Sequence, residues 1–430
     1  MLKVSVSGVR GTVPDDFNPL IVMRYTSAFA RIIDGKKILL ARDTRPHGPL
    51  FYDIVSSTLR MAGKDVYSIG IAPTPTAQFI SRKMNMDGGI ILTASHNPEN
   101  WNALKLSAGG GRFLFRDELE RLLSHLDDYR WVVPWGERVE IEDAVERHVE
   151  AVVESGYVER GHVRVVADCV NGAMYRALPL VLERLGAEVR KVYCEPSGKF
   201  ERNPEPRREY LRHLEVFLND EFALAFATDP DGDRVVVGVK GHGMLSEEMT
   251  VALSVDYLLN FVRGDVVVNY STSILVEFVA RRHGVRVIRA PVGEANVLRR
   301  MEEVGSPIGG EGNGGLIFPE VNATRDGILA SAVLYSSYVS GRLMDTLGSL
   351  PETYMLKEKV EGGSVEEVLE KFRPLVEGFE LTTEDGYYFR RGNSWLHIRP
   401  SNTEPIVRIY AESTDRSFVD SVRELLKGAS

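Results

Sequence analysis

Three aspartates occupy alternating positions of one short polar segment: Asp229, Asp231 and Asp233, with Gly232 between the last two. Glycine tolerates a tight turn, so this spacing lets three hard oxygen ligands converge on one cation such as Mg²⁺. The calcium loop of an EF-hand needs its glycine at the sixth position, whereas here it is the fourth residue counted from Asp229. Aspartate and glycine are also common turn residues, so a solvated acidic turn is the plainer alternative.

Ser95 lies beside His96 in a polar run of sequence TASHNP at 93–98, directly after the apolar stretch 89–92. A serine with a neighbouring base is one route to covalent catalysis. The G-x-S-x-G pattern of many serine hydrolases is absent from this run, which argues against that class. A serine that only caps backbone groups is the alternative for this motif taken alone.

A glycine-rich loop follows the apolar residues 307–308. It matches G-x-G-x-x-G, but that pattern is weak without a following helix and a later ribose-binding acid. The carboxylate of Glu311 would also repel a pyrophosphate. Glu311 and Asn313 are better suited to hydrogen bonds with sugar hydroxyls, and a flexible glycine loop is the alternative.

A further polar loop, near the C-terminus, has the composition of a phosphate site. It offers two guanidinium groups with hydroxyl, amide and backbone donors within ten positions: Arg399, Ser401, Asn402, Thr403 and Arg408. Such a mixture of forked cationic donors and neutral donors suits a phosphate dianion. Arginines on an exposed edge strand are the alternative.

The elements that must hold these loops repeat along the chain. A β-branched strand, an amphipathic helix, a Gly-x-x-Val step and a second strand occur in that order three times, at 38–66, 163–189 and 266–287. Strand, helix and strand of this size predict βα units in a largely parallel sheet. A later apolar stretch of each copy, at 89–92, 222–226 or 307–308, leads into a polar loop. Ligands of open α/β sheets bind beyond the strand carboxyl ends, so we expect three related domains to supply one loop each to a shared central cleft.

The last part of the chain breaks this pattern. A helical face there is formed by Val365, Val368, Leu369 and Phe372, and paired strands are expected at 395–399 and 406–411. The expected fold is therefore α/β, with three related mixed α/β domains and a smaller C-terminal α+β domain around the cleft. The expected boundaries are 1–150, 151–242, 243–348 and 349–430.

Bulk properties exclude several classes of protein. A chain of 430 residues is too long for a single core. Its net charge of −9 argues against a nucleic-acid protein, which would normally carry a basic face. No segment approaches the roughly 18 apolar residues of a membrane span, and no secretory signal pattern is present, so we expect no membrane partner and a cytoplasmic location. The two cysteines, Cys169 and Cys194, are expected to be buried thiols.

Taken together, the four loops resemble those of the α-D-phosphohexomutase family of phosphoglucomutases, phosphomannomutases and phosphoglucosamine mutases. The resemblance extends from the SGVRG segment at 7–11 to the loop at 399–405. It implies four domains, which carry the phosphoserine, the metal, the sugar and the phosphate in chain order. It also implies transfer of a phosphoryl group between the 1- and 6-hydroxyls of a hexose phosphate through phosphoserine and a 1,6-bisphosphate. Mg²⁺ is the implied metal, and hexose 1,6-bisphosphate is the implied activator.

Residue roles follow from the resemblance, motif by motif. Ser95 corresponds to the phosphoserine and a metal ligand, and Asp229, Asp231 and Asp233 to the other metal ligands. Lys105 corresponds to a lysine near the reacting hydroxyl. Arg10 and His96 correspond to residues beside the phosphoserine, and Arg234 to one beside the metal loop. Sugar and phosphate recognition is implied for Glu311, Asn313, Arg399, Ser401, Asn402, Thr403 and Arg408.

Two departures and two alternatives accompany this interpretation. The family often has glycine where Ala103 stands and serine where Asn313 stands, and the second departure falls in the sugar loop.

The expected substrates are those of a phosphomannomutase/phosphoglucomutase, with phosphoglucosamine mutase as the alternative. From another class, the D-x-D-G run beginning at Asp229 resembles the opening of aspartyl-phosphate sugar phosphatases, although Arg234 then follows Asp233 deep in the chain. The sequence leaves the oligomeric state open.

Overall fold

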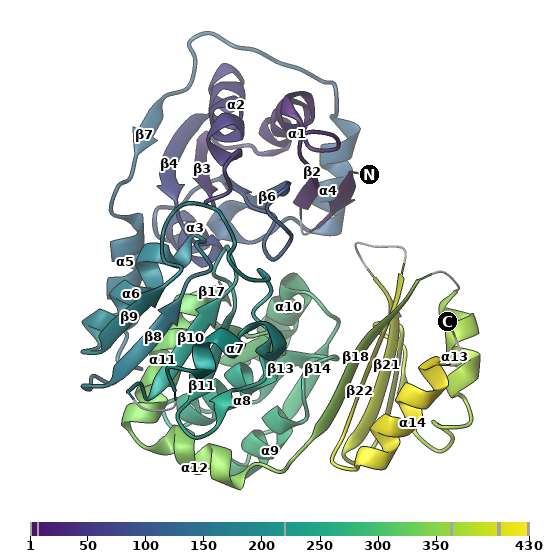
Figure 1. Cartoon of the computed structure of the whole chain (residues 1–430). Helices are drawn as coiled ribbons and strands as arrows, with labels where there is room; N and C mark the ends of the chain where they lie inside the picture. The colour runs from purple at the N-terminus through teal and green to yellow at the C-terminus, as the bar shows by residue number, and fades with distance from the viewer. Residues whose placement is uncertain (1, 7, 219–220, 362–363, 402–405, 428–430) are drawn as a thin grey trace. The chain divides into compact units, whose positions relative to one another are not determined.

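The computed structural model describes residues 2–6, 8–218, 221–361, 364–401 and 406–427. The chain divides into two compact units. Figure 1 labels their helices and strands. The first unit comprises Met1–Thr250 and Gly314–Arg342, and the second comprises Val251–Asn313 and Leu343–Ser430. The chain therefore crosses from the first unit to the second and back before it ends in the second.

The N-terminal part of the first unit is built on a seven-stranded sheet of order β1-β2-β6-β5-β3-β4-β7. Residues of β3 and β5 alternate into a core that α1, α2 and α4 cover, as the strand period of two requires. The strands are β1 (Lys3–Ser5), β2 (Gly8–Thr12), β3 (Lys37–Arg42), β4 (Asp65–Ile71), β5 (Gly88–Leu92), β6 (Trp101–Ala108) and β7 (Arg138–Glu140). The helices are α1 (Pro19–Ile32), α2 (Gly48–Met61), α3 (Thr74–Lys83), α4 (Arg116–Ser124) and α5 (Ala144–Val153), with a 3₁₀ turn at Gly109–Gly111.

A second sheet of the first unit has the order β12-β11-β10-β8-β9. Its strands are β8 (Arg164–Asp168), β9 (Glu188–Val192), β10 (Leu224–Thr228), β11 (Val235–Val239) and β12 (Gly243–Met244), and its helices are α6 (Met174–Arg184) and α7 (Arg212–Glu215), with a 3₁₀ turn at Arg208–Tyr210. Strands β10 and β11 are buried along their whole length. The unit is completed by the antiparallel hairpin of β16 (Gly315–Phe318) and β17 (Asn322–Arg325), followed by α11 (Gly327–Val339).

The second unit contains a parallel set of three strands and an antiparallel sheet. In the first, β13 (Val266–Asn269) pairs with both β14 (Val287–Ala290) and β15 (Ile308–Glu311). In the second, the order is β18-β22-β21-β20-β19, with bounds Tyr354–Glu361, Ile406–Ser413, Ser394–Pro400, Tyr387–Arg391 and Glu380–Thr382. Its helices are α9 (Leu275–Arg282), α10 (Glu294–Val304), α13 (Val365–Phe372) and α14 (Arg416–Lys427), while α8 (Glu248–Leu258) and α12 (Arg342–Ser349) begin at the boundary with the first unit.

The predicted repeat is confirmed strand by strand. Each copy has a central strand with a parallel neighbour on either side, in the order β4-β3-β5, β9-β8-β10 and β14-β13-β15. The predicted polar loops after residues 92 and 226 begin at or just beyond the carboxyl ends of β5 and β10, whereas the first three residues of the third predicted loop, 309–311, belong to β15 and only 312–314 form the turn before β16. The C-terminal antiparallel sheet with its two helices is the expected α+β domain, whose core includes Leu396, Ile409 and Phe372.

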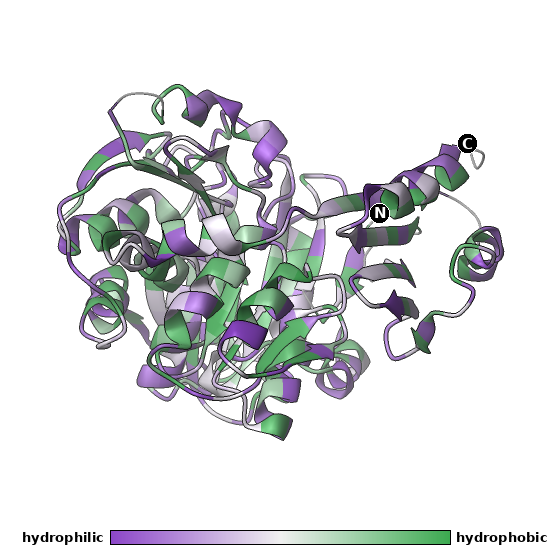
Figure 2. Ribbon diagram, turned by 90° about the horizontal axis from the view of Figure 1, so that it is seen from below, coloured by the Kyte–Doolittle hydropathy of each residue, from purple (hydrophilic) through white to green (hydrophobic). Residues whose placement is uncertain are grey.

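Apolar residues are frequent in the strands (Figure 2), and the buried apolar residues of the helices belong to the same core clusters as those of the strands. Among the residues that the structure describes, no helix combines the length and the apolar character that a membrane span would require.

The expectation of two free thiols is wrong. Cys169 directly follows β8 and Cys194 lies just beyond β9, and the two are joined by a disulfide with their Cα atoms 4.9 Å apart. The physical reason is register, because Asp168 pairs with Val192 on these neighbouring parallel strands. Chain leaving the same edge of the sheet thus brings the two cysteines within disulfide reach.

Candidate active site

The loops that follow β5 and β10 meet inside the first unit. Ser95 Oγ donates a hydrogen bond of 3.1 Å to Asp229 Oδ2. Lys105 on β6, the antiparallel neighbour of β5, donates to Asp231 Oδ2 at 2.5 Å. Thr74, the first residue of α3, donates its hydroxyl to the same Asp231 oxygen at 2.7 Å and its N–H to the Asp231 carbonyl at 2.8 Å. Serine, lysine and the acidic loop therefore form one cluster.

The three aspartates can hold a cation. One carboxylate oxygen from each of Asp229, Asp231 and Asp233 lies within 4.8 Å of the others, and all three side chains are buried. Asp231 Oδ1 and Asp233 Oδ1 are buried and accept no hydrogen bond from the described residues. Buried carboxylate oxygens without donors are costly unless something else satisfies them. Hard oxygen ligands in this number fit Mg²⁺.

The pKa values of these carboxyl groups reflect the cost of bringing several negative charges together in a buried loop. Burial raises the pKa of Asp229 well above its usual range, and repulsion from Asp233 and Asp231 raises it further. Burial would also raise the pKa of Asp231, but the charge and hydrogen bond of Lys105 hold that pKa below its ordinary value. The loop therefore concentrates negative charge that a divalent cation would relieve.

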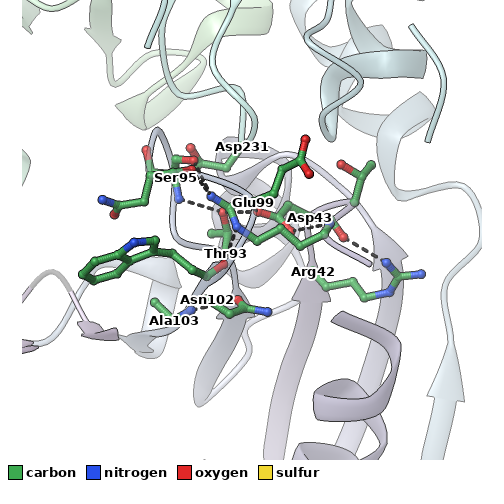
Figure 3. Close-up of polar contacts among 12 residues, drawn as sticks. Arg42, Asp43, Thr93, Ser95, Glu99, Asn102, Ala103 and Asp231 are labelled. Atoms are coloured by element: carbon green, nitrogen blue, oxygen red, sulfur yellow. Dashed lines mark hydrogen bonds and ion pairs between the residues drawn. The ribbon is translucent and has the colours of Figure 1, made fainter. Parts of the chain in front are cut away.

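Ser95 is held in an unusual backbone conformation. Its φ is +49°, a region that residues other than glycine rarely occupy. Its N–H donates to Thr93 Oγ1 at 3.0 Å, and the Thr93 hydroxyl donates to Asp43 Oδ2 at 2.7 Å (Figure 3). Strain of this kind persists only where the surroundings fix it.

The fixing group is Arg45, in the loop after β3, whose side chain is fully buried. Its guanidinium pairs with Asp43 at 2.6 Å and donates to the carbonyl oxygen of Ser95 at 3.1 Å. It also donates to the carbonyl oxygens of Asn97, at 2.6 Å, and Trp101, at 2.7 Å. Asp43 and Arg45 therefore hold the Ser95 loop through residues before and after the serine. Asp43 accepts from Thr93, and Arg45 donates to carbonyl oxygens that follow Ser95.

Sequence reasoning missed Asp43, Arg45 and Thr74. The sequence did contain a signal for Asp43 and Arg45. They form a charged D-x-R run directly after an apolar strand, and ligands of α/β sheets bind beyond the carboxyl ends of such strands. Thr74 gave no signal, since its role depends on a contact with a residue 157 positions away.

Three further predicted residues lie around this cluster. His96 is half-buried, with Nδ1 3.5 Å from Ser95 Oγ, and burial followed by the charges of Arg234 and Arg10 lowers its pKa well below the ordinary value. The Arg234 guanidinium lies 3.5 Å from Asp233 and 3.9 Å from Asp229. Arg10 Nη1 donates to Asn97 Oδ1 at 3.4 Å. The structure thus brings all the predicted residues of the reaction centre together.

The predicted sugar residues belong to the second unit. Glu311 ends β15, is buried, and its Oε1 accepts hydrogen bonds from Asn269 Nδ2 at 2.7 Å and from Gly293 N–H at 2.8 Å. These bonds fix the carboxylate at the carboxyl edge of the parallel strands. Asn313, two residues on, is half-buried.

The predicted phosphate residues lie on the antiparallel sheet of the same unit. Arg399 on β21 stands directly opposite Arg408 on β22. Arg399 is buried, 3.9 Å from Asp385, and its Nε has no hydrogen-bond partner among the described residues. Arg408 Nε donates to Ser401 Oγ at 3.3 Å. Asn402 and Thr403 lie outside the described residues.

The Arg45 contacts predict a loss of turnover without unfolding. Arg45→Lys keeps the charge that Asp43 needs but cannot reach three carbonyl oxygens at once. We expect a near-parental melting temperature and a fall in kcat of about ten- to hundredfold, because small misplacement of a reacting group is costly. Arg60→Lys, which loses a contact to the Gly136 carbonyl away from the site, is the matched control. Parental kcat in Arg45→Lys would contradict this role.

Comparison with known proteins matches nearly the whole chain to one family. Models of phosphoglucomutase/phosphomannomutase domains I, II, III and the C-terminal domain match residues 1–132, 146–243, 246–354 and 355–428. A phosphoglucomutase/phosphomannomutase of Thermococcus kodakarensis is 33% identical, covering 98% of this chain and 96% of the relative. A probable phosphoglucosamine mutase of Methanopyrus kandleri is also 33% identical, covering 98% of each.

Solved structures agree on the fold. The crystal structure of a phosphoglucomutase/phosphomannomutase family protein from Burkholderia thailandensis superposes with a TM-score of 0.86 at 24% identity, covering 99% of this chain and 98% of that one. With four domain models in order and relatives matched over nearly their full length, the chain belongs to the phosphoglucomutase/phosphomannomutase family of phosphohexomutases.

Proposed function

We propose that this phosphohexomutase interconverts hexose 1-phosphate and hexose 6-phosphate, with Ser95 as the phosphoryl carrier. The observation that supports it most is the hydrogen bond of 3.1 Å between Ser95 Oγ and Asp229 Oδ2, beside two further aspartates that each have a buried oxygen accepting no hydrogen bond from the described part of the chain. A phosphoryl group on Ser95 would extend into this acidic loop. Such an arrangement is stable only with a cation between the two, and Asp229, Asp231, Asp233 and phosphoserine 95 would hold it.

The reaction is assigned to this chain's residues as follows. The sugar hydroxyl attacks the phosphorus of phosphoserine 95, a new P–O bond forms, and the P–Oγ bond breaks. Lys105, assisted by neutral His96, manages the proton that the hydroxyl loses and the serine oxygen gains. The bound Mg²⁺ would neutralise charge on the transferring group. The hexose 1,6-bisphosphate turns end for end and returns its other phosphoryl group to Ser95.

Free hexose 1,6-bisphosphate would also act as the activator, because it can phosphorylate Ser95 in an enzyme that has lost the group. Arg10 and Arg234 are assigned to neutralising the negative charge of that phosphoryl group, because the positive charges of both act on His96, which is the neighbour of Ser95.

Phosphate recognition is assigned to Arg399, Ser401 and Arg408, with Asn402 and Thr403 of the same loop. Arg399 and Arg408 face each other across an antiparallel pair, where like charges repel. A phosphate dianion would turn that repulsion into a bidentate attraction. Glu311 and Asn313 are assigned to the sugar hydroxyls, because hydrogen bonds from Asn269 and Gly293 fix the Glu311 carboxylate at the end of β15.

The proposal extends to the location of the enzyme in the cell. We propose a cytoplasmic location, where charged sugar phosphates are made and used. The disulfide between Cys169 and Cys194 is consistent with this in organisms whose intracellular proteins are disulfide-rich, such as hyperthermophiles.

The carrier role predicts a phosphorylated serine. Intact mass and peptide mapping of the purified protein should show a fraction bearing one phosphoryl group on Ser95. Ser95→Ala should lose that group and mutase turnover, while Ser81→Ala, at a buried serine of α3, should keep both. Near-parental turnover in Ser95→Ala would exclude the covalent mechanism, and activity in Asp229→Asn would separately exclude an aspartyl-phosphate phosphatase.

The sugar is tested by rates on three substrates. If Glu311 contacts hydroxyls shared by C2 epimers, kcat/KM for glucose 1-phosphate and mannose 1-phosphate should be comparable, and a difference beyond about three orders of magnitude would mean that another contact distinguishes the epimers at C2. A coupled assay that includes glucosamine 1-phosphate decides between the two activities that relatives of equal identity carry. A dominant rate on glucosamine 1-phosphate would establish the phosphoglucosamine mutase alternative.

A further inference from the structure

The hairpin β16–β17 lies against the metal loop within the first unit. Val235 N–H donates to the Gly314 carbonyl at 3.1 Å, just before β16, and Gly327 N–H donates to the Gly232 carbonyl at 3.1 Å, just after β17. The hairpin belongs to the sequence range of domain III, whereas the metal loop belongs to domain II. A segment about ninety residues away in sequence therefore supports the acidic loop.

The last residue of this hairpin reaches a metal ligand. Arg325 Nη2 donates to Asp233 Oδ2 at 2.5 Å, and the Arg325 side chain is only 12% exposed. The other oxygen, Asp233 Oδ1, accepts no hydrogen bond from the described residues, and Arg234 Nε lies 3.5 Å from it as an ion pair. Arg325 thus occupies Asp233 Oδ2, the oxygen that also lies 4.0 Å from Lys105 Nζ.

Asp231 is arranged in the same way. Its Oδ2 accepts from Lys105 and Thr74, and its Oδ1 accepts from none of the described residues. Groups that hold one oxygen of a metal-binding carboxylate orient the other and tune metal affinity. We propose that Arg325 is a positioning residue of the metal site, holding Asp233 Oδ2 so that Oδ1 is presented to the cation. The inference rests on the metal site assigned under the proposed function.

Gly315 makes room for this arginine. A Cβ at position 315 would lie 2.5 Å from Arg325 Cδ and 2.9 Å from its Cγ, and its three nearest atoms all belong to Arg325. The backbone φ of Gly315 is not in the positive range, so alanine would fit the chain itself. The contact with a flexible side chain is then what a substitution disturbs. Gly315→Ala should push the stem of Arg325 aside and withdraw its guanidinium from Asp233.

The test is Mn²⁺ binding to the full-length enzyme, measured by electron paramagnetic resonance of free Mn²⁺. Arg325→Met should raise the Mn²⁺ Kd by about ten- to hundredfold, the usual effect of losing such a partner. Arg325→Lys, which keeps one charged donor, should fall between Arg325→Met and the parent. Gly315→Ala should weaken binding by a factor similar to Arg325→Met, and the double variant should be no weaker than Arg325→Met alone.

Arg82 provides a control that distinguishes the contact between Arg325 and Asp233 from general anchoring of the hairpin. Arg82 donates to the Val321 carbonyl and to Asn322 Oδ1 in the same hairpin, without contacting an aspartate of the metal loop. Arg82→Met should therefore leave the Mn²⁺ Kd unchanged. Melting temperatures of all variants report whether each remains folded, and Arg325→Lys carries the test if Arg325→Met unfolds.

Distinct outcomes overturn distinct claims. Unchanged or tighter Mn²⁺ binding by folded Arg325→Met or Arg325→Lys would overturn the role of Arg325, because the guanidinium would then only repel the cation. Equal weakening by Gly315→Ala with and without Arg325 would overturn the role given to Gly315. Failure of the parent to bind Mn²⁺, or binding undiminished in Asp231→Asn, would overturn the metal site itself and Arg325 with it.

Discussion

The structure of the first unit depends on one electrostatic constraint, the burial of three carboxylates with oxygens within 4.8 Å of one another. Unit charges this close repel strongly in a medium of low dielectric constant. Three cationic side chains offset this charge: Lys105 contacts Asp231 and lies 4.0 Å from Asp233, Arg325 contacts Asp233, and Arg234 lies near both Asp233 and Asp229. Lys105 and Arg325 both donate to Oδ2 atoms, so Oδ1 of Asp231 and Oδ1 of Asp233, which accept no hydrogen bond from the described residues, are left for a divalent ion.

That constraint also explains why distant parts of the chain converge. Lys105 and Thr74 come from the first sheet and its helix α3, the aspartates follow β10, and Arg325 ends the β16–β17 hairpin. None of these segments could satisfy the acidic loop alone. The charge requirement therefore links three sequence domains in one unit, and the same contacts bring Ser95 to Asp229.

A second requirement is that Ser95 be held still while its substituent changes. Its positive φ is costly for a serine, and the loop is kept in place by bonds from Arg45 to three carbonyl oxygens. These bonds involve backbone acceptors, so they survive any change at the Ser95 hydroxyl. The nucleophile can gain and lose a dianionic group while the chain that carries it remains fixed.

The sequence was sufficient to predict what depends on local spacing. Alternating aspartates, the serine after an apolar strand and the threefold strand–helix–strand pattern each follow from short-range periodicity, and the repeated strands lie where that pattern predicts them, except that β15 continues to Glu311 through residues that were expected to form a loop. Asp43, Arg45, Thr74 and Arg325 were not predicted, because their partners are backbone carbonyls or carboxylates far along the chain. The cysteines were misjudged for a related reason, since their proximity arises from the register of β8 and β9.

The most direct test of the account is a crystal structure of the phosphorylated enzyme grown with Mn²⁺, with the ion located by anomalous scattering. The account predicts one Mn²⁺ bound by an oxygen of each of Asp229, Asp231 and Asp233 and by the phosphoryl group on Ser95, while Lys105 and Arg325 keep the opposite oxygens of Asp231 and Asp233. An ion bound elsewhere, or an acidic loop that stays without an ion beside phosphoserine 95, would contradict it.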